Sequence, residues 1–390
     1  MFLQIHFLTS YHATLLNRDD AGLAKRIPFG GAERLRVSSQ CQKRHWREWL
    51  MEQTDLPSGL RTREFFGREI KPRLVKDGMD ESLAHALTLH LAKALLTAAG
   101  EKDAVDKDTL AMKQPVLFGK PEADFFVWLI EEAAKQGDEK AASEWLGQQI
   151  KEGKKNLKAL MNQAGVHDLA AGFEGALFGR FVTSDILARL DAPVHVAHAF
   201  TTHALDTEVD FFTVVDDLNK DEETGAAHAG DMELGAGIFY GYVAVDIPLL
   251  VSNLTGAKAK DWREQDHADA RKLLERLIHA FAQVSPGAKL GATAPYAHAE
   301  WMLLETGNGQ PRSLANAYLQ PVKPSNTVHP LKQSADAAAD YLSGMEQMYG
   351  KDEAGRWVSS RHPWPRESEP VLPLPEAIDK ALNHVFGDTP

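Results

Sequence analysis

The order of hydrophobic patterns along the chain constrains the fold more than any other feature. Residues 1–9 alternate in polarity with a period of two, which predicts a strand. Between about residues 61 and 179, apolar side chains recur three and four positions apart, which predicts a block of helices. Strand patterns return over 194–202 and 237–247, and we then expect a helix over 261–284, a strand over 300–305 and a helix over 334–349. This order favours an α+β fold in which a split β-α-β unit carries two insertions.

The composition is that of a folded protein without thiol chemistry. At 390 residues and 44% hydrophobic content, the chain can bury a large core. The first ten residues lack the basic start of a secretory signal, and no apolar run reaches the roughly 20 residues of a membrane span, so we expect a soluble, cytoplasmic protein. Cys41 is the single cysteine and has no second thiol for a disulfide or a CxxC metal site. We expect it to be a small, buried or half-buried side chain.

Charge is unevenly distributed along the chain. The formal net charge of −12 argues against a nucleic-acid partner, because phosphate binding depends on Lys and Arg. Residues 17–47, however, contain eight Lys or Arg against three acids, a local balance of +5. Residues 206–233 contain ten acids and one Lys, a balance of −9. A basic patch separated from acidic segments in this way is compatible with nucleic-acid binding.

The basic segment has the features of a phosphate-binding helix start. We expect a short extended stretch over residues 35–37. Ser38-Ser39-Gln40 then offers a helix N-cap, and Trp46, Trp49 and Leu50 follow at helical spacing. Free backbone N–H groups at a helix start favour phosphate. Lys43 and Arg47 are four residues apart and therefore share one helical face. The alternative is an ordinary solvated basic face.

Eight segments carry a resemblance to a known family, in the same order over nearly the whole chain. They are LNRDD (16–20), PFGG (28–31), RLRVSSQCQKR (34–44), GRFVTSD (179–185), HVAHAFTTHALDTEVDFFTVVDDL (195–218), AAHAGDMELGAGIFYGY (226–242), VSPGAK (284–289) and RSLANAY (312–318). The sequence resembles the Cas-seven family of CRISPR backbone subunits, in particular its CasC, or Cse-four, branch of type I-E Cascade. Residues 61–167 and about the last fifty residues match less recognisably.

The resemblance implies an α+β fold with an RRM-like (ferredoxin-like) palm, a large helical fingers insertion and a β-hairpin thumb. The boundaries that we expect are 1–60, 180–202 and 237–390 for the palm, 61–179 for the fingers and 203–236 for the thumb.

The resemblance also implies a non-catalytic protein that polymerises along a CRISPR guide RNA and presents it in segments for pairing with invading DNA. The implied partners are the guide RNA, the target DNA strand, further copies of the chain, the Cascade subunits CasA, CasB, CasD and CasE, and a recruited helicase-nuclease that acts on the complex. Because a guide is held without regard to sequence, its contacts should go to phosphates and sugars. The RNA-binding residues that we expect are Asn17, Arg18, Arg26, Arg34, Arg36, Ser38, Ser39, Gln40, Lys43, Arg47, Arg180 and Lys289.

A second group of residues is expected to displace a base or contact the duplex. In the family, the thumb tip intrudes on the RNA–target duplex, and an apolar wedge can stabilise an unstacked base. The expected residues are Phe181, Thr183, His203, Phe211, Phe212, Thr213 and His228. The alternative for the three phenylalanines is an ordinary place in the core.

Other chemistries are open from the residues alone. Asp19 and Asp20 could hold Mg²⁺ for ribonuclease activity of the type III backbone kind, or could pair with Arg18 or Arg26. His195, His198 and His203 are common metal-ligand types, but if 194–202 is one strand, His195 and His198 point to opposite faces. We expect no metal. The glycine stretches form neither a Walker A motif nor a strand-linked GxGxxG, so we expect no cofactor. A purely structural assembly protein, whose basic patch binds acidic neighbours, is a third possibility.

Overall fold

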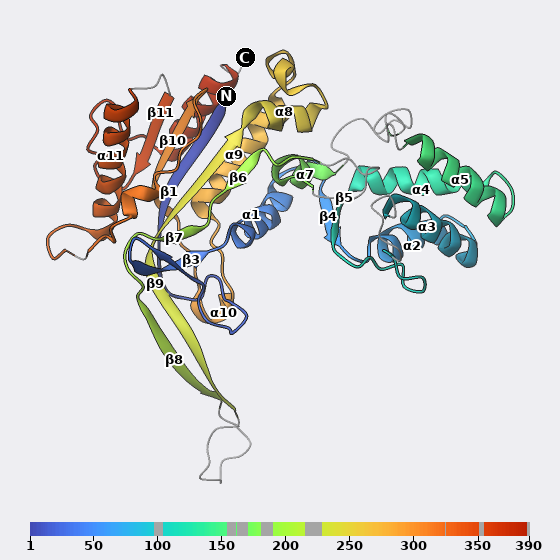
Figure 1. The fold of residues 1–390 in the computed structure, drawn as a ribbon, viewed down its shortest axis with the longest axis horizontal. Coiled ribbons are helices and arrows are strands. Elements are labelled where there is room, and N and C mark those ends of the chain that lie inside the picture. Colours follow the sequence, from blue (N-terminus) through green and yellow to red (C-terminus); the bar gives the residue numbers. More distant parts are fainter. Residues whose placement is uncertain are drawn as a thin grey trace, which may run out of the picture. The chain divides into compact units, whose positions relative to one another are not determined.

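A computed structural model gives the fold of two compact units, which are described separately (Figure 1). The first unit consists of Met1–Thr54, His195–Asp246 and Arg271–Pro390, and the second of Asp55–Val194 and Ile247–Ala270. The structure describes residues 1–96, 104–153, 161, 171–180, 190–214, 228–323, 325–350 and 355–387, without the side chains of 151–153, 213–214 and 228–229.

An antiparallel sheet forms the centre of the first unit. Strand β1 (Phe2–Thr14) lies between β9 (His228–Asp246) and β10 (Ala299–Gly307) and pairs with both. The sheet order is β11-β10-β1-β9-β7-β3-β2, and β6 and β8 also pair with β9. The remaining strands are β2 (Arg26–Phe29), β3 (Ala32–Val37), β6 (Val194–Val196), β7 (Ala199–Thr201), β8 (Thr207–Val214) and β11 (Gly355–Ser360).

Alternation along β1 gives the sheet two apolar faces. The Phe7 ring stacks on Phe281 of α9 (Ala268–Gln283) and meets Trp46 of α1 (Ser39–Gln53) edge to face. The next residue, Leu8, lies in the core on the other side with α11 (Pro330–Tyr349). The unit also contains α10 (Leu290–Thr293), η4 (Ala315–Tyr318) and α12 (Leu374–Phe386).

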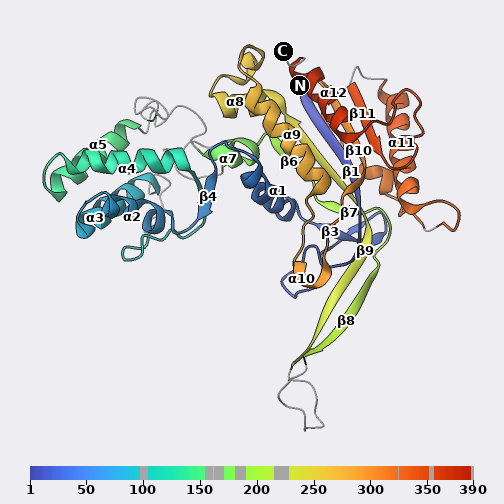
Figure 2. The same cartoon turned by 180° about the vertical axis from the view of Figure 1, so that it is seen from behind.

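Strands β8 and β9 form a hairpin that extends beyond the sheet (Figure 2). Strand β9 starts in the hairpin and continues into the sheet beside β1, so it begins nine residues before the strand expected over 237–247. The expected helix over 261–284 is interrupted. A short helix, η3 (Ala259–Glu264), ends before the Asp266 carboxylate accepts the backbone N–H of Ala268 at the start of α9.

The second unit is mainly helical. Its core contains Phe65, Phe66, Phe118 and Phe126, whose rings stack or meet edge to face. The unit includes Ile247–Ala270, which the expected boundaries assign to the palm. Its elements are β4 (Gly59–Thr62), η1 (Phe66–Ile70), α2 (Lys71–Lys76), α3 (Glu81–Leu96), β5 (Val116–Gly119), α4 (Lys120–Ala134), α5 (Glu139–Gly153), α7 (Gly172–Phe178), α8 (Ile247–Thr255) and η3. Among the described helices of either unit, none has the length and apolar character needed to cross a bilayer.

Candidate nucleic-acid interface

Pairing between β3 and β7 builds a group of basic side chains. Arg36 of β3 lies opposite Phe200 of β7, which places His198 beside the Arg36 side chain. Nη1 of Arg36 is 2.7 Å from Nδ1 of His198. The backbone N–H of Arg36 donates to the carbonyl of Lys25 at 2.8 Å, so Lys25 belongs to the same neighbourhood. We call Lys25, Arg36, Lys43 and His198 the basic cluster.

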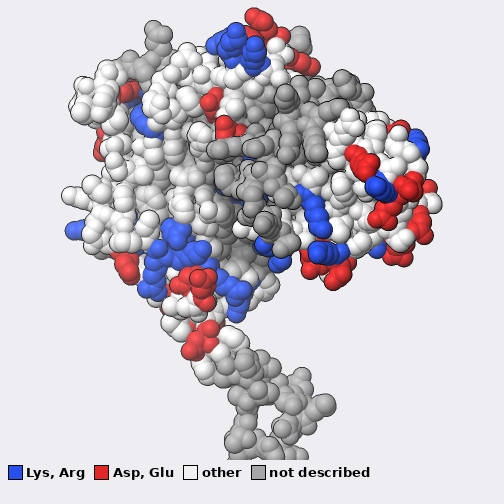
Figure 3. Space-filling view, turned by 45° about the vertical axis from the view of Figure 1, so that its right-hand side comes forward, with Lys and Arg blue, Asp and Glu red and all other residues white. Residues whose placement is uncertain are grey.

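The pKa of His198 reflects the charges of the other three members of the basic cluster. Burial lowers the pKa of His198, and the positive charges of Arg36, Lys25 and Lys43 lower it further. No ion pair joins Lys25 or Arg36 to an acid within the described part of the chain. Figure 3 shows Lys and Arg side chains gathered where the hairpin leaves the sheet, with acidic side chains among them. The cluster is therefore a concentration of positive charge that a phosphate group could neutralise.

The start of α1 is fixed by side-chain hydrogen bonds. Of the three residues expected to offer an N-cap, Ser38 is the N-cap, and its Oγ accepts the N–H of Cys41 at 3.3 Å. Asn17 Oδ1 accepts the N–H of Ser38 at 2.9 Å, and Gln42 Nε2 donates to the carbonyl of Ala197 at 3.0 Å. Asn17 and Ser38 thus fix the start of α1, and Gln42 holds the helix to the segment between β6 and β7.

The remaining residues of α1 divide between a buried face and an exposed one. Ser39 is buried with Trp46, whereas Gln40 is exposed. Lys43 and Arg47 are half-buried and lie on one flank of the helix, as their spacing predicts. Burial raises the pKa of the Cys41 thiol, which is half-buried as expected.

Arg34 is not a surface residue, so its assignment as an RNA contact is wrong. The side chain is 0% exposed. Its guanidinium donates to the carbonyls of Thr201 at 2.8 Å and Tyr318 at 2.9 Å. Arg34 therefore joins β3 to the end of β7 and to η4.

Arg180, in the second unit, is also wrongly assigned to the RNA. It is buried and forms an ion pair with the buried Glu122 at 2.6 Å. Two other arginines of the expected set lie in the first unit. Arg26 pairs with Glu233 and Glu33, and Arg18 is exposed.

The two adjacent phenylalanines of the hairpin point to opposite faces of β8. Phe211 is 65% exposed, and Val209, on the same face of β8, is 64% exposed. Phe212 points the other way, joins the core cluster that contains Leu35 and Met232, and lies beneath Lys289. Phe211 is thus free to act as a wedge, and Phe212 is a packing residue, as the alternative for it predicted.

His203 is a structural residue at the base of the hairpin. Its Nε2 accepts the N–H of Ile238 at 3.2 Å, and Nδ1 lies 2.7 Å from the carbonyl of Ala204. Phe181 and Thr183 lie outside the described residues. Thr213 and His228 lie in β8 and β9, but their side chains are outside the described part.

The Asp19 carboxylate accepts hydrogen bonds from the backbone of its own loop. Oδ1 accepts the backbone N–H groups of Ala21 at 2.9 Å and Leu23 at 3.0 Å. Asp19 therefore binds backbone groups rather than the Arg18 or Arg26 side chains. Among the described residues, no group of three or more His, Cys, Asp or Glu side chains could hold a metal ion. His195 and His198 are both exposed, and they lie in and after β6, which is separate from β7.

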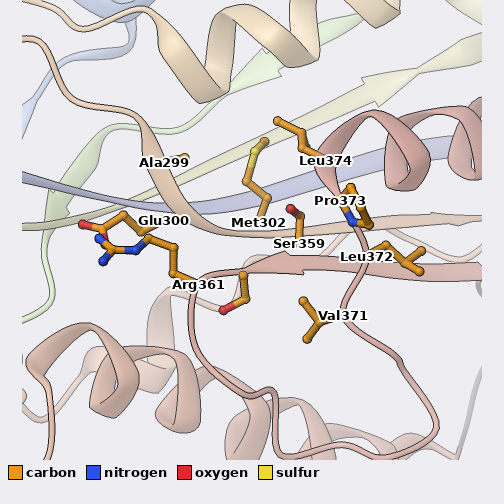
Figure 4. A pocket seen from close by; sticks show the side chains of 10 residues that line it. Ala299, Glu300, Met302, Ser359, Arg361, Val371, Leu372, Pro373 and Leu374 are labelled. Atoms are coloured by element: carbon orange, nitrogen blue, oxygen red, sulfur yellow. The ribbon is translucent and has the colours of Figure 1, made fainter.

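A cleft of about 430 Å³ elsewhere in the first unit has different chemistry (Figure 4). It lies between β10, β11 and the start of α12, and Met302, Val371 and Leu372 supply apolar surface. Arg361 lines it as well but is paired with Glu300. This cleft therefore lacks the concentration of cations found in the basic cluster.

The family of the chain is decided by a match that spans nearly its full length. The profile of the CT1975-like protein family matches residues 3–380. The chain belongs to this family. The match confirms the resemblance to the Cas-seven backbone family that the sequence segments indicated. No curated protein matches the chain.

Two solved structures show the same fold. One, described as a CRISPR RNA-guided surveillance complex, pre-nicking, has a TM-score of 0.79 at 24% sequence identity and covers 99% of this chain and 100% of its own. Another, described as a CRISPR RNA-guided surveillance complex, has a TM-score of 0.69 at 21% identity and covers 98% and 100%. The mixed α+β fold with an antiparallel sheet is thus shared with subunits of such complexes.

Sequence reasoning missed two members of the basic cluster. From the sequence His198 is a candidate metal ligand, whereas its place beside Arg36 depends on the pairing of β3 with β7. Lys25 was counted in the basic segment but not assigned to the RNA. Strands β2 and β3 form a hairpin joined through the PFGG turn, and this pairing brings the backbone carbonyl of Lys25 to the N–H of Arg36. A hairpin predicted from the PFGG turn would therefore have placed Lys25 beside Arg36.

Proposed function

We propose that the chain is a non-catalytic backbone subunit that coats the guide RNA of a type I-E CRISPR surveillance complex. The observation that carries this proposal is the basic cluster. In a CT1975-like chain with a net charge of −12, it brings Lys25, Arg36 and Lys43 together near the start of α1, and among the described residues no acid is ion-paired with Lys25 or Arg36. Such a surface suits a polyanion.

The chemistry of the cluster fits recognition without regard to sequence. Lys25, Arg36 and Lys43 are cations that bind phosphate oxygens, and Gln40 lies exposed at the same helix start. An interface of this kind leaves the bases free to pair with a target strand. We retain Arg18, Arg36, Gln40, Lys43, Arg47 and Lys289 as proposed RNA contacts.

The sheet supports the proposal of an RRM-like, ferredoxin-like palm. The central strand β1 has antiparallel neighbours on both sides, and α1 and α9 pack on one face. The helical second unit would be the fingers and the β8–β9 hairpin the thumb.

The hairpin would act on the target rather than on guide loading. Its segment is acidic, so phosphate repels it at long range, and the exposed Phe211 is suited to contact with an unstacked base. In this arrangement, copies of the chain line up along the guide RNA with CasA, CasB, CasD and CasE. The target DNA strand pairs in segments, and a recruited helicase-nuclease performs the cleavage.

A metal-dependent ribonuclease is the second candidate function. The hydrogen bonds of Asp19 Oδ1 to Ala21 and Leu23 favour a loop-stabilising role over metal binding. Asp20 is exposed, and we propose no catalytic role for it.

Binding of the purified full chain to single-stranded RNAs of unrelated sequence tests the proposal. We expect similar affinities for all of them and a steep loss of affinity with added salt. Strong preference for one sequence, or affinity independent of salt, would contradict phosphate-based coating.

A further inference from the structure

We propose that His198 is a phosphate-positioning residue of the RNA site, which holds Arg36 with one ring nitrogen and presents the other to the RNA backbone. This inference rests on the proposed function. It adds a residue that neither the family match nor the resemblance assigns.

The geometry determines which ring nitrogen carries the proton. An arginine guanidinium can only donate hydrogen bonds. Nδ1 of His198, 2.7 Å from Nη1 of Arg36, must therefore accept and is unprotonated. The proton of the neutral ring is then on Nε2, which makes no hydrogen bond to another residue in the described ranges of the chain. Because His198 is exposed, this N–H is available to a ligand.

The surroundings of His198 select an anion as that ligand. Arg36 faces it from β3, Lys25 from the segment before β2, and Lys43 from α1. Burial lowers the pKa of His198, and these three cations lower it further because they disfavour a positive charge on the ring. A proton on Nδ1 would end its acceptance from Arg36, so the arrangement requires the neutral ring, which burial and these cations favour.

The direction of the pH effect follows from this requirement. Protonation of Nδ1 leaves the ring without an acceptor for the Arg36 guanidinium. The part of the RNA affinity that depends on His198 should therefore be lost as the pH falls below the ordinary histidine value of about 6.5. Other histidines are common to all variants of His198, so they contribute equally to each pH profile.

Three variants of the full chain, titrated with single-stranded RNA, test the inference. His198→Ala should lower affinity roughly tenfold at pH 7.5, because a donor to phosphate and the support of Arg36 are both lost. His195→Ala is the matched control, since His195 is exposed in the preceding strand and lies outside the cluster, and it should leave affinity unchanged. His198→Asn replaces Nδ1 with an amide oxygen that can still accept from Arg36 but does not titrate. It should bind more tightly than His198→Ala at every pH, whereas the advantage of the unaltered chain over His198→Ala should shrink between pH 7.5 and 5.5.

The outcomes separate the inference from the function on which it rests. If the unaltered chain binds no RNA, both the role of His198 and the proposed function are refuted. If it binds RNA, but His198→Ala behaves as His195→Ala does, only the role of His198 is refuted. The same conclusion follows if His198→Asn keeps the pH profile of the unaltered chain. Should His198→Ala fail to fold, the pH profile of His198→Asn decides alone.

Discussion

The ammonium nitrogen of Lys289 lies 5.5 Å from the centroid of the Phe212 ring. This cation–π contact joins the loop before α10 to the hairpin. The ring also fills the space over Gly230, where a Cβ atom would lie 2.8 Å from the Phe212 ring. Phe211, the preceding residue, is exposed on the opposite face. Two adjacent phenylalanines therefore have different environments, and they should respond differently to substitution.

Phe212→Ala should destabilise the first unit, and Phe211→Ala should not. Removal of a partly buried ring costs about 1–3 kcal/mol in the free energy of unfolding, whereas truncation of an exposed ring has little effect. Chemical denaturation of both variants measures the difference. Equal loss of stability in the two variants would show that Phe211 and Phe212 are not in different environments.

Phe211→Ala should instead weaken stable pairing with a target strand while guide RNA loading stays normal. An aromatic contact with an unstacked base contributes roughly 1–3 kcal/mol, and loading depends on the basic cluster. RNA content and target-strand affinity of the assembled complex, both at fixed salt, give the two values. Val209→Ala removes a neighbouring exposed apolar side chain and serves as the comparison. Normal target affinity in Phe211→Ala would show that Phe211 does not act as a wedge.

Joint replacement of Lys43 and Arg47 by alanine should weaken binding to every RNA sequence. Loss of two phosphate contacts should also reduce the slope of log affinity against log salt by about 1.4 for a single strand. Lys332→Ala with Lys380→Ala is the matched control, since it removes two cations from α11 and α12. An unchanged slope in the first variant, or an equal change in the control, would remove α1 from the site.

Arg34→Lys should destabilise the protein even though the charge is kept. A lysine cannot reproduce the fork that reaches the carbonyls of Thr201 and Tyr318, so buried acceptors would lose their donor. We expect a loss of about 1–3 kcal/mol in the free energy of unfolding. Arg18→Lys, at an exposed position, should have no effect on stability. A stable Arg34→Lys variant with weakened RNA binding would restore Arg34 to the interface.

Asp19→Ala should have no cleavage activity to remove. We expect the assembled complex to leave matched RNA intact in Mg²⁺, because the Asp19 carboxylate stabilises its loop through backbone N–H groups. The cleavage assay is run with the unaltered chain, Asp19→Ala and Asp20→Ala. Metal-dependent cutting that either substitution abolishes would support the ribonuclease function instead.

Local features of the site were predictable from the sequence, and long-range ones were not. An N-cap within Ser38-Ser39-Gln40 and the shared flank of Lys43 and Arg47 depend on neighbouring residues, and both are confirmed. Burial of Arg34 depends on carbonyls contributed by Thr201 and Tyr318, far along the chain. Nothing in the segment RLRVSSQ distinguishes this arginine from the half-exposed Arg36 two residues later.

The phenylalanine pair shows a signal that was present but not used. Adjacent residues of a strand point to opposite faces, so Phe211 and Phe212 could not both be wedges if β8 was a strand. The period of two is visible in β8, where Glu208 and Asp210 alternate with Val209 and Phe211. Which of the two rings would be covered still depended on Lys289 and on the core around Leu35.

The most direct test of the central claim is to purify the full chain with its native partners and sequence the RNA that accompanies it. Coating of a guide predicts discrete small RNAs with a common repeat-derived end and variable inserts, protected from nuclease in proportion to the amount of the chain. Absence of RNA, or recovery of random cellular fragments with no common end, would contradict the account.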